Sequence, residues 1–181
     1  MTSPSPVPDR QSLVTLVLGG ARSGKSRFAE ELLADRSGRR LYLATAEPHD
    51  AEMAERIRHH RQRRGNAWRT VEAPIDVAPV LNSAGEDAVL LDCLTLWLSN
   101  LMAAGREIEP AVQGLCAALR QPRAPIVLVS NEVGLGIVPD NALAREFRDQ
   151  AGRLNQAVAA TADRVYFIAA GLPMTLKDKA A

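Results

Sequence analysis

A glycine loop that ends in a lysine and a serine is the stretch of this sequence best suited to chemistry. Residues 19–26 read GGARSGKS, so four residues lie between Gly19 and Gly24, and Lys25 and Ser26 follow directly. This spacing matches the phosphate-binding pattern G-x-x-x-x-G-K-[S/T]. The glycines let backbone N–H groups converge on an anion, the lysine adds a positive charge, and the serine hydroxyl is a ligand for Mg²⁺. The motif predicts a site for a nucleoside triphosphate and Mg²⁺.

The residues on either side of the motif support this interpretation. Residues 13–18 form an apolar run rich in β-branched side chains, which is typical of a buried strand, and residues 27–33 have a helical pattern. A strand, a tight loop and a helix whose positive end faces the loop together form an anion site. The alternative is a glycine-rich turn with an accidental Lys-Ser pair, and the flanking strand and helix argue against it.

The rest of the chain alternates apolar runs with helical patterns. The further expected strands are 41–45, 88–93, 125–130 and 164–169. The expected helices are 50–64, 74–81, 94–104, 110–119 and a long one from a cap at Asp140 to about residue 162, while 66–73 is expected to be a connector with some strand character. The apolar face of the long helix consists of Leu143, Phe147, Ala151, Leu154 and Val158. This order favours a single α/β domain with a mostly parallel sheet and helices on both faces.

Polar residues follow several of the expected strands. Thr45, Asp92, Asn131 and Glu132 stand at or just after strand ends. Because ligands of such sheets bind at the carboxyl ends of the strands, these residues should converge on the phosphate loop. A carboxylate in this position can hold Mg²⁺, so Asp92 is the expected partner of Ser26 in a metal site. The alternative role for Asp92 is that of a cap for the next helix.

Composition restricts the class of protein. The 181-residue chain has 22 basic and 21 acidic residues and a formal net charge of +1, so its overall balance indicates neither nucleic acid nor an anionic membrane as partner. No apolar run is long enough to span a membrane. The two cysteines lie in apolar surroundings without metal-ligand spacing, which favours buried thiols in a reducing cytosol over a disulfide. We expect a cytoplasmic protein with a disordered, Ser/Pro-rich extension at 1–12 and one domain at 13–181.

A basic segment, RIRHHRQRR at 56–64, contains two adjacent histidines. This segment could be a solvated helix face, a clamp that binds polyphosphate over the loop, or a stripe that binds nucleic acid. The third interpretation is disfavoured because the segment lacks the aromatic stacking partners of a single-strand binder. Neighbouring helix residues point about 100° apart, so His59 and His60 cannot share a metal ion. A neutral imidazole here could attack an α-phosphate and form a covalent phosphoramidate.

Five segments resemble, in order, the bifunctional adenosylcobinamide kinase / adenosylcobinamide-phosphate guanylyltransferase family of cobalamin biosynthesis. The similarity covers residues 13–177. The segments are GGARSGKS at 19–26, RIRHHRQRR at 56–64 followed by WRTVE at 68–72, LLDCLTLWLSNL at 90–101, SNEVGLGIVPDN at 130–141 and FRDQAGRLNQ at 147–156.

The resemblance implies a two-step activity on a RecA-like P-loop fold. Adenosylcobinamide is phosphorylated with ATP or GTP, and GMP then passes from GTP to adenosylcobinamide phosphate through a guanylylated histidine, which yields adenosyl-GDP-cobinamide and pyrophosphate. In the family motif His-x-x-x-Arg the nucleophile corresponds to His60, with Arg64, and His59 is the second candidate. The resemblance also implies a homotrimer. It does not locate the corrinoid, for which our own hypothesis is a site near residues 131–139 and the apolar helix after Asp92.

The residues that the motif and the resemblance assign to nucleotide are found in five places. Lys25 is also expected to be catalytic, and Ser26 and Asp92 to bind Mg²⁺. The nucleotide-binding set is Gly19, Gly20, Ala21, Arg22, Ser23, Gly24, Lys25, Ser26, Ala44, Thr45, Ala46, Arg61, Gln62, Arg63, Arg64, Glu72 and Asp92.

Three other functions compete with this one. A monofunctional P-loop small-molecule kinase would use the loop in the same way but form no covalent nucleotide adduct. A nucleic-acid-stimulated ATPase is disfavoured by the near-neutral charge, so no nucleic-acid partner is expected. A regulatory GTP-binding module is disfavoured because the chain has no N-K-x-D motif.

Overall fold

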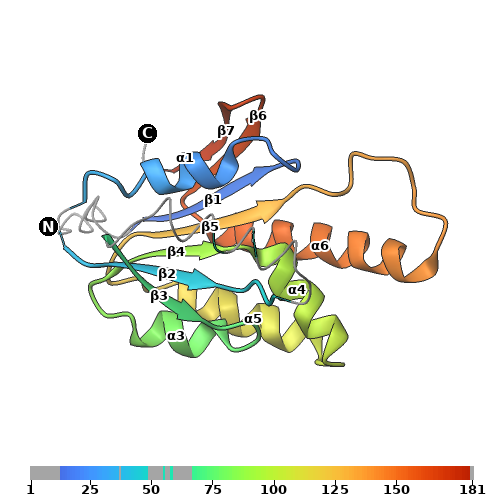
Figure 1. Ribbon diagram of the computed structural model, residues 1–181, viewed down its shortest axis with the longest axis horizontal. Helices are drawn as coiled ribbons and strands as arrows, with labels where there is room; N and C mark the ends of the chain where they lie inside the picture. The colour runs from blue at the N-terminus through green and yellow to red at the C-terminus, as the bar shows by residue number, and fades with distance from the viewer. Residues whose placement is uncertain (1–12, 37, 49–54, 56–57, 59–66, 180–181) are drawn as a thin grey trace, which may run out of the picture.

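A seven-stranded sheet forms the centre of the computed structural model, which describes residues 13–36, 38–48, 55, 58 and 67–179 (Figure 1). The order across the sheet is β3-β2-β4-β5-β1-β6-β7. Neighbouring strands from β3 to β6 are parallel, and β7 pairs antiparallel with β6. The strands are β1 (Val14–Gly19), β2 (Arg40–Ala44), β3 (Trp68–Glu72), β4 (Ala88–Asp92), β5 (Ile126–Asn131), β6 (Arg164–Ala169) and β7 (Leu172–Asp178).

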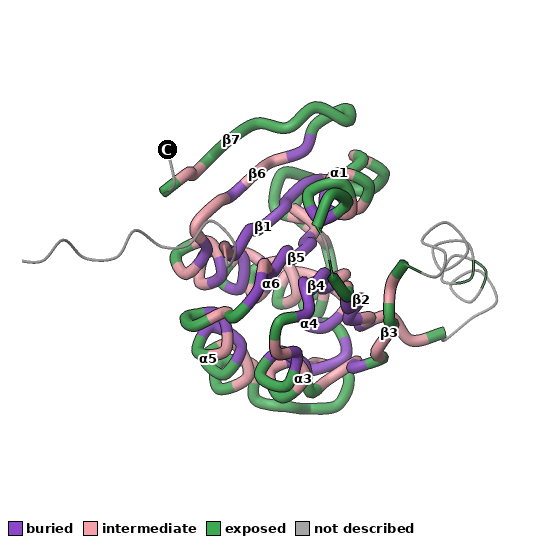
Figure 2. Tube along the Cα trace, turned by 90° about the vertical axis from the view of Figure 1, so that its left-hand side faces the viewer, coloured by how far each residue is buried: buried purple, intermediate pink, exposed green. Residues whose placement is uncertain are grey.

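Helices cover both faces of this sheet. Helix α1 packs on one face, and α3 to α6 pack on the other, as the end-on view in Figure 2 shows. The described helices are α1 (Lys25–Glu31), α3 (Val77–Ser83), α4 (Leu94–Ala103), α5 (Ile108–Leu119) and α6 (Ala142–Thr161). The predicted α/β class, with a mostly parallel sheet between helices, is confirmed. The predicted helix 50–64 and the predicted extension 1–12 fall outside the described residues, apart from Glu55 and Arg58.

The central strands are apolar on both faces because both faces are covered. Along β1, Leu16 and Leu18 pack toward the larger helical layer and Val17 packs toward α1. The larger layer is centred on Trp97, which is 1% exposed and donates its indole N–H to the Ile75 carbonyl at 2.7 Å. None of the described helices combines the length and apolar composition needed to cross a membrane.

Two strands were not among the five that the sequence predicts. Segment 66–73, expected to be a connector with some strand character, contains the parallel edge strand β3, and β7 follows β6 through a tight turn. In that turn Ala170 and Gly171 both have positive φ, 51° and 81°, as the favoured two-residue hairpin turns require. Both strands lie at sheet edges, where β3 is at most half-buried and β7 is largely exposed, so neither has the continuous apolar run that marks a central strand.

The start of α6 corrects the predicted cap. Asn141, not Asp140, is the cap residue, and its side-chain oxygen accepts from the Ala144 N–H at 2.7 Å. The predicted apolar face is buried at its C-terminal end, where Ala151 lies in the core. At the N-terminal end Leu143 is 68% exposed, because the first turns of α6 extend past the sheet (Figure 1).

Candidate functional site

The glycine loop joins β1 to α1 at the carboxyl edge of the sheet. Its chain leaves the strand at Gly19 and enters the helix at Lys25, which is 8% exposed. The Lys25 ammonium donates to the Gly20 carbonyl at 2.9 Å, so the side chain folds back over the loop. No side chain caps the N terminus of α1, and the helix cap is Gly24 with a φ of 94°. The backbone therefore has the geometry that a phosphate-binding loop needs.

Neighbouring strands hold this loop from both sides. The Glu132 N–H after β5 donates to the Gly19 carbonyl at 3.1 Å, and the Gly171 N–H of the β6–β7 turn donates to the Ser23 carbonyl at 2.9 Å. A Cβ on Gly19 would lie 2.7 Å from the Ile168 carbonyl oxygen. Close backbone packing thus requires glycine where the strand ends, in addition to the conformational requirement at Gly24.

Replacing Gly24 with alanine should lower the free energy of unfolding by about 1–2 kcal/mol, because φ is positive there and an L-residue is strained. The new Cβ would also lie 3.3 Å from the Gly171 Cα. Gly20→Ala is the matched control, since a Cβ there meets nothing within 4 Å. Urea unfolding of the nucleotide-free protein measures both changes, and equal losses for the two variants would contradict this account.

Strand alternation directs three strand ends toward the same side of the sheet. Val17, Leu90 and Val129 pack on the face that α1 covers. Because side chains alternate, Asp92 and Asn131, each two residues further along its strand, also belong to that face. Asn131 is level with Gly19, and Asp92 is level with Val129 on the neighbouring strand. The phosphate loop, Asn131 and Asp92 therefore meet on the α1 side of one edge.

The two expected metal ligands, Ser26 and Asp92, have side chains suited to Mg²⁺. Within the described part of the chain neither side chain forms a hydrogen bond or ion pair. The alternative role for Asp92 is not observed, because α4 begins after Cys93 and has no side-chain cap. Since β5 separates β1 from β4, Asp92 lies about 10 Å from the loop strand, counted as two strand spacings. A hydroxyl and a carboxylate fit a hard cation that completes its shell with phosphate and water.

The end of β2 carries the predicted segment Ala44–Ala46. Ala44 and Ala46 are half-buried, whereas Thr45 is fully buried. Its hydroxyl donates to the Cys93 carbonyl and accepts from the Cys93 N–H, both at 2.8 Å. The Thr45 hydroxyl therefore holds the start of α4, a role that no motif in the sequence indicates.

Glu72 lies farther from the loop than the other predicted acidic residue. It is exposed at the end of β3 and level with Ala44. The strand order puts four spacings, about 19 Å, between β3 and β1. If a nucleotide whose phosphates lie on the loop contacts Glu72 of the same chain, the contact is made by its nucleoside end. His60, the neighbouring His59 and the segment 61–64 fall outside the described residues.

Both cysteines are buried and unpaired, as the sequence predicts. Burial raises the pKa of the Cys93 thiol, and the adjacent Asp92 carboxylate raises it further. Cys93 is therefore a neutral thiol and no nucleophile. Its Sγ lies 3.2 Å from the Thr95 Oγ1.

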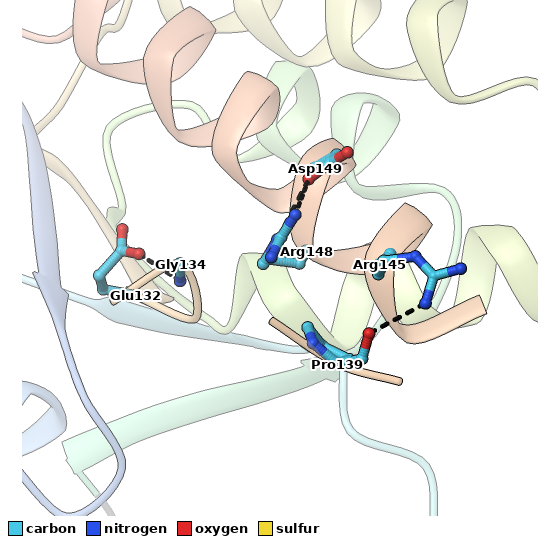
Figure 3. A network of polar contacts seen from close by, with 6 residues as sticks. All are labelled: Glu132, Gly134, Pro139, Arg145, Arg148 and Asp149. Atoms are coloured by element: carbon cyan, nitrogen blue, oxygen red, sulfur yellow. Dashed lines mark hydrogen bonds and ion pairs between the residues drawn. The ribbon is translucent and has the colours of Figure 1, made fainter. Parts of the chain in front are cut away.

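The loop between β5 and α6 is held by polar contacts at both ends (Figure 3), and its middle is apolar. Glu132 accepts from the Gly134 N–H at 2.5 Å, and Arg145 donates to the Pro139 carbonyl at 3.0 Å. Between these contacts the exposed fractions are 81% for Leu135, 98% for Ile137 and 62% for Val138. The β5–α6 loop that carries this exposed apolar segment starts beside the phosphate loop, where the Glu132 N–H donates to the Gly19 carbonyl, whereas the apolar side of α4 is buried.

The sheet and the loop define a P-loop nucleotide-binding protein. Solved structures agree on the fold: an ATPase of the type III secretion system of pathogenic bacteria has a TM-score of 0.54 at 14% identity, covering 91% of this chain. The P4 protein from bacteriophage phi6 in complex with ADP has a TM-score of 0.51 at 17% identity, covering 96% of this chain. This chain spans 57% and 60% of the lengths of those two chains.

Sequence comparison identifies the family. The profile of the cobinamide kinase / cobinamide phosphate guanyltransferase family matches residues 15–176, and the chain belongs to that family. It is 48% identical to the bifunctional adenosylcobalamin biosynthesis protein CobP of Pseudomonas aeruginosa, covering 91% of this chain and 97% of the relative. It is 44% identical to the corresponding CobU of Salmonella typhimurium, covering 91% of this chain and all of the relative.

Proposed function

We propose that this protein phosphorylates adenosylcobinamide with ATP or GTP, and then transfers GMP from GTP to the resulting phosphate. The products of the second step are adenosyl-GDP-cobinamide and pyrophosphate. Family membership supports this proposal, together with relatives at 43–48% identity that are named bifunctional. The observation that carries it is a phosphate loop whose lysine lies on the same sheet face as the Asp92 carboxylate.

In the first step a hydroxyl of the substrate attacks the γ-phosphorus of the bound nucleotide, and the bond to the β-phosphate oxygen breaks. The N–H groups of the loop hold the phosphates, and Lys25 neutralises charge that develops on the transferred group. Ser26 and Asp92 would hold Mg²⁺, which supplies further positive charge to the phosphates when bound. The protein thus acts mainly by position and charge.

In the second step a neutral imidazole is the nucleophile. We place His60 in this role, with His59 as the second candidate. The imidazole attacks the α-phosphorus of GTP, a P–N bond forms, and pyrophosphate leaves. A phosphate oxygen of adenosylcobinamide phosphate then attacks the same phosphorus, and the P–N bond breaks. Arg61, Gln62, Arg63 and Arg64 are proposed to bind the triphosphate, and Ala44–Ala46 and Glu72 to contact the nucleotide.

Product analysis tests this sequence of steps. The purified protein is incubated with adenosylcobinamide, Mg²⁺ and ATP, and GTP is then added. The corrinoids present before and after the addition are separated and identified by mass spectrometry. We expect adenosylcobinamide phosphate first and adenosyl-GDP-cobinamide after GTP is added. Accumulation of adenosylcobinamide phosphate without adenosyl-GDP-cobinamide would mean that the protein is a monofunctional kinase. Absence of both products would overturn the proposal.

We propose that the corrinoid docks on the exposed apolar loop, residues 135–138. These residues belong to the β5–α6 loop, which starts beside the phosphate site at Glu132, and they offer exposed apolar side chains to a large, partly apolar substrate. Ile137→Asp should therefore raise the KM for adenosylcobinamide about 10-fold or more, the effect of losing a buried apolar contact of 1.5–3 kcal/mol. The KM for GTP is the internal control. Equal changes in the two constants would remove this docking assignment.

We propose that the protein assembles as a homotrimer, and that β7 lies in the contact. Leu172, Met174 and Leu176 alternate along this edge strand and are 70%, 55% and 58% exposed. Such an apolar row on an open strand is usually covered by a partner. Light scattering after size exclusion should give three times the 19.5 kDa chain mass, and replacing the three residues with threonine should lower it. A monomer for the unsubstituted protein would contradict the proposal.

A further inference from the structure

A chain of polar contacts, buried except for the half-buried Asn131, links three strand ends beside the site. Its members are Thr45 after β2, Cys93 after β4, Thr95 in the first turn of α4, and Asn131 at the end of β5; we call this set the polar bridge. Thr45 contacts Cys93 at 2.8 Å, the Cys93 Sγ lies 3.2 Å from Thr95, and Asn131 Nδ2 donates to Thr95 at 2.6 Å. No catalytic role has been assigned above to Thr95 or Asn131.

Thr45 controls the backbone directly after Asp92. Its hydroxyl binds both the N–H and the carbonyl of Cys93, and it is 0% exposed. Asn100 of α4 in turn donates to the Thr45 carbonyl at 2.8 Å. The regular pairing of β4 with its neighbouring strands ends at Asp92, so the hydrogen bonds of the sheet no longer fix the backbone conformation beyond that residue. The direction in which the Asp92 carboxylate projects therefore depends on how Cys93 is held.

Asn131 connects the bridge to the phosphate loop. It pairs in register with Gly19, and the next residue, Glu132, donates to the Gly19 carbonyl at 3.1 Å. Through Thr95 and Cys93 the chain of contacts thus runs from the loop to the residue after Asp92. Buried polar groups with satisfied partners hold one geometry, because breaking any contact leaves an unpaired group.

We propose that Thr45 and Asn131 are positioning residues: the polar bridge sets the orientation of the Asp92 carboxylate relative to the phosphate loop, and so the affinity for the divalent cation. This inference rests on the proposed function, in which Asp92 is a cation ligand. Residues that orient a ligand typically change metal affinity by about 10- to 100-fold when they are replaced.

Binding of Mn²⁺ in the presence of a non-hydrolysable GTP analogue tests the bridge without any turnover. Free Mn²⁺ is measured by electron paramagnetic resonance. Thr45→Val keeps the branched shape and removes the hydroxyl, and we expect about 10-fold weaker Mn²⁺ binding. Thr45→Ser keeps the hydroxyl and should bind within about twofold of the unsubstituted protein. Asn131→Ala is the second test variant and should also weaken Mn²⁺ binding. It provides the test if Thr45→Val does not fold.

Ser130→Ala is the matched control. Like Thr45, Ser130 is 0% exposed, and it lies in β5 next to Asn131. Its hydroxyl, however, donates to Asn155 of α6 at 2.7 Å, on the opposite face of the sheet. It should leave Mn²⁺ affinity unchanged. Equal weakening in Ser130→Ala and Thr45→Val, or normal binding in both Thr45→Val and Asn131→Ala, would overturn the inference.

Asp92→Asn separates this inference from the proposed function. If Asp92→Asn weakens Mn²⁺ binding while the bridge variants do not, only the positioning role is wrong. If Asp92→Asn binds Mn²⁺ normally, the ligand assignment in the proposed function is wrong, and the bridge inference fails with it.

Discussion

Replacing Lys25 with alanine should lower the rate of phosphoryl transfer about 100- to 1,000-fold, the usual cost of removing one charge-stabilising donor. Lys25 is buried at the start of α1, and its ammonium lies 2.9 Å from the Gly20 carbonyl inside the loop. Alanine removes the positive charge that offsets the charge of the transferred group. The rate is measured with saturating ATP and adenosylcobinamide, so that reduced nucleotide affinity does not account for the loss.

Arg27→Ala is the matched control for Lys25→Ala. Arg27 lies two residues along the same helix and pairs with Glu31 at 2.8 Å, with 79% of its side chain exposed. Exposed pairs of this kind contribute little to stability, so the control should fold and turn over normally. Similar losses in both variants would mean that α1 tolerates no truncation, and the catalytic role of Lys25 would lose its support.

Replacing His60 with alanine should abolish guanylyl transfer, by a factor on the order of 10⁴ or more, because loss of a nucleophile removes the covalent route. The kinase step should keep its rate, since it uses the loop and not the imidazole. Both rates are measured on one preparation, with adenosylcobinamide for the first step and adenosylcobinamide phosphate for the second. The unchanged kinase rate shows that the variant is folded.

His59→Ala is the paired variant, one residue away in the same basic segment. It should retain guanylyl transfer. If the loss appears in His59→Ala and not in His60→Ala, the nucleophile is His59 and the chemistry stands. If neither variant loses the second activity, no histidine of this pair is the nucleophile.

The central sheet and the phosphate loop were predictable from the sequence for a physical reason. Strands covered on both faces are apolar along their whole length, so β4 and β5 appear as the runs 88–93 and 125–130. The glycine loop is likewise a local pattern. Edge strands have no such signal, because β3 is at most half-buried and β7 is largely exposed. The strand β7 also depends on a turn that begins with Ala170 at positive φ.

The site was predictable as a set of strand ends, but not as a set of contacts. Because the carboxyl ends of parallel strands lie at one edge of the sheet, the sequence was enough to place Asp92 and Asn131 at the same edge as the loop. The bond between Thr45 and Cys93 joins residues 48 positions apart, and that between Asn131 and Thr95 joins residues 36 apart. Such contacts depend on strand register and on the start of α4, which no local pattern encodes. The predicted helix 50–64, with His60, stays a prediction.

The most direct test of the bifunctional mechanism is covalent labelling with GTP that is radioactive at the α-phosphate. The protein is incubated with labelled GTP and Mg²⁺ and then denatured, and label that is stable to base and labile to acid is counted. We expect label on the unsubstituted protein and on His59→Ala, and none on His60→Ala. No label on a preparation that still transfers the γ-phosphate would contradict the guanylyl-histidine mechanism and leave a P-loop kinase.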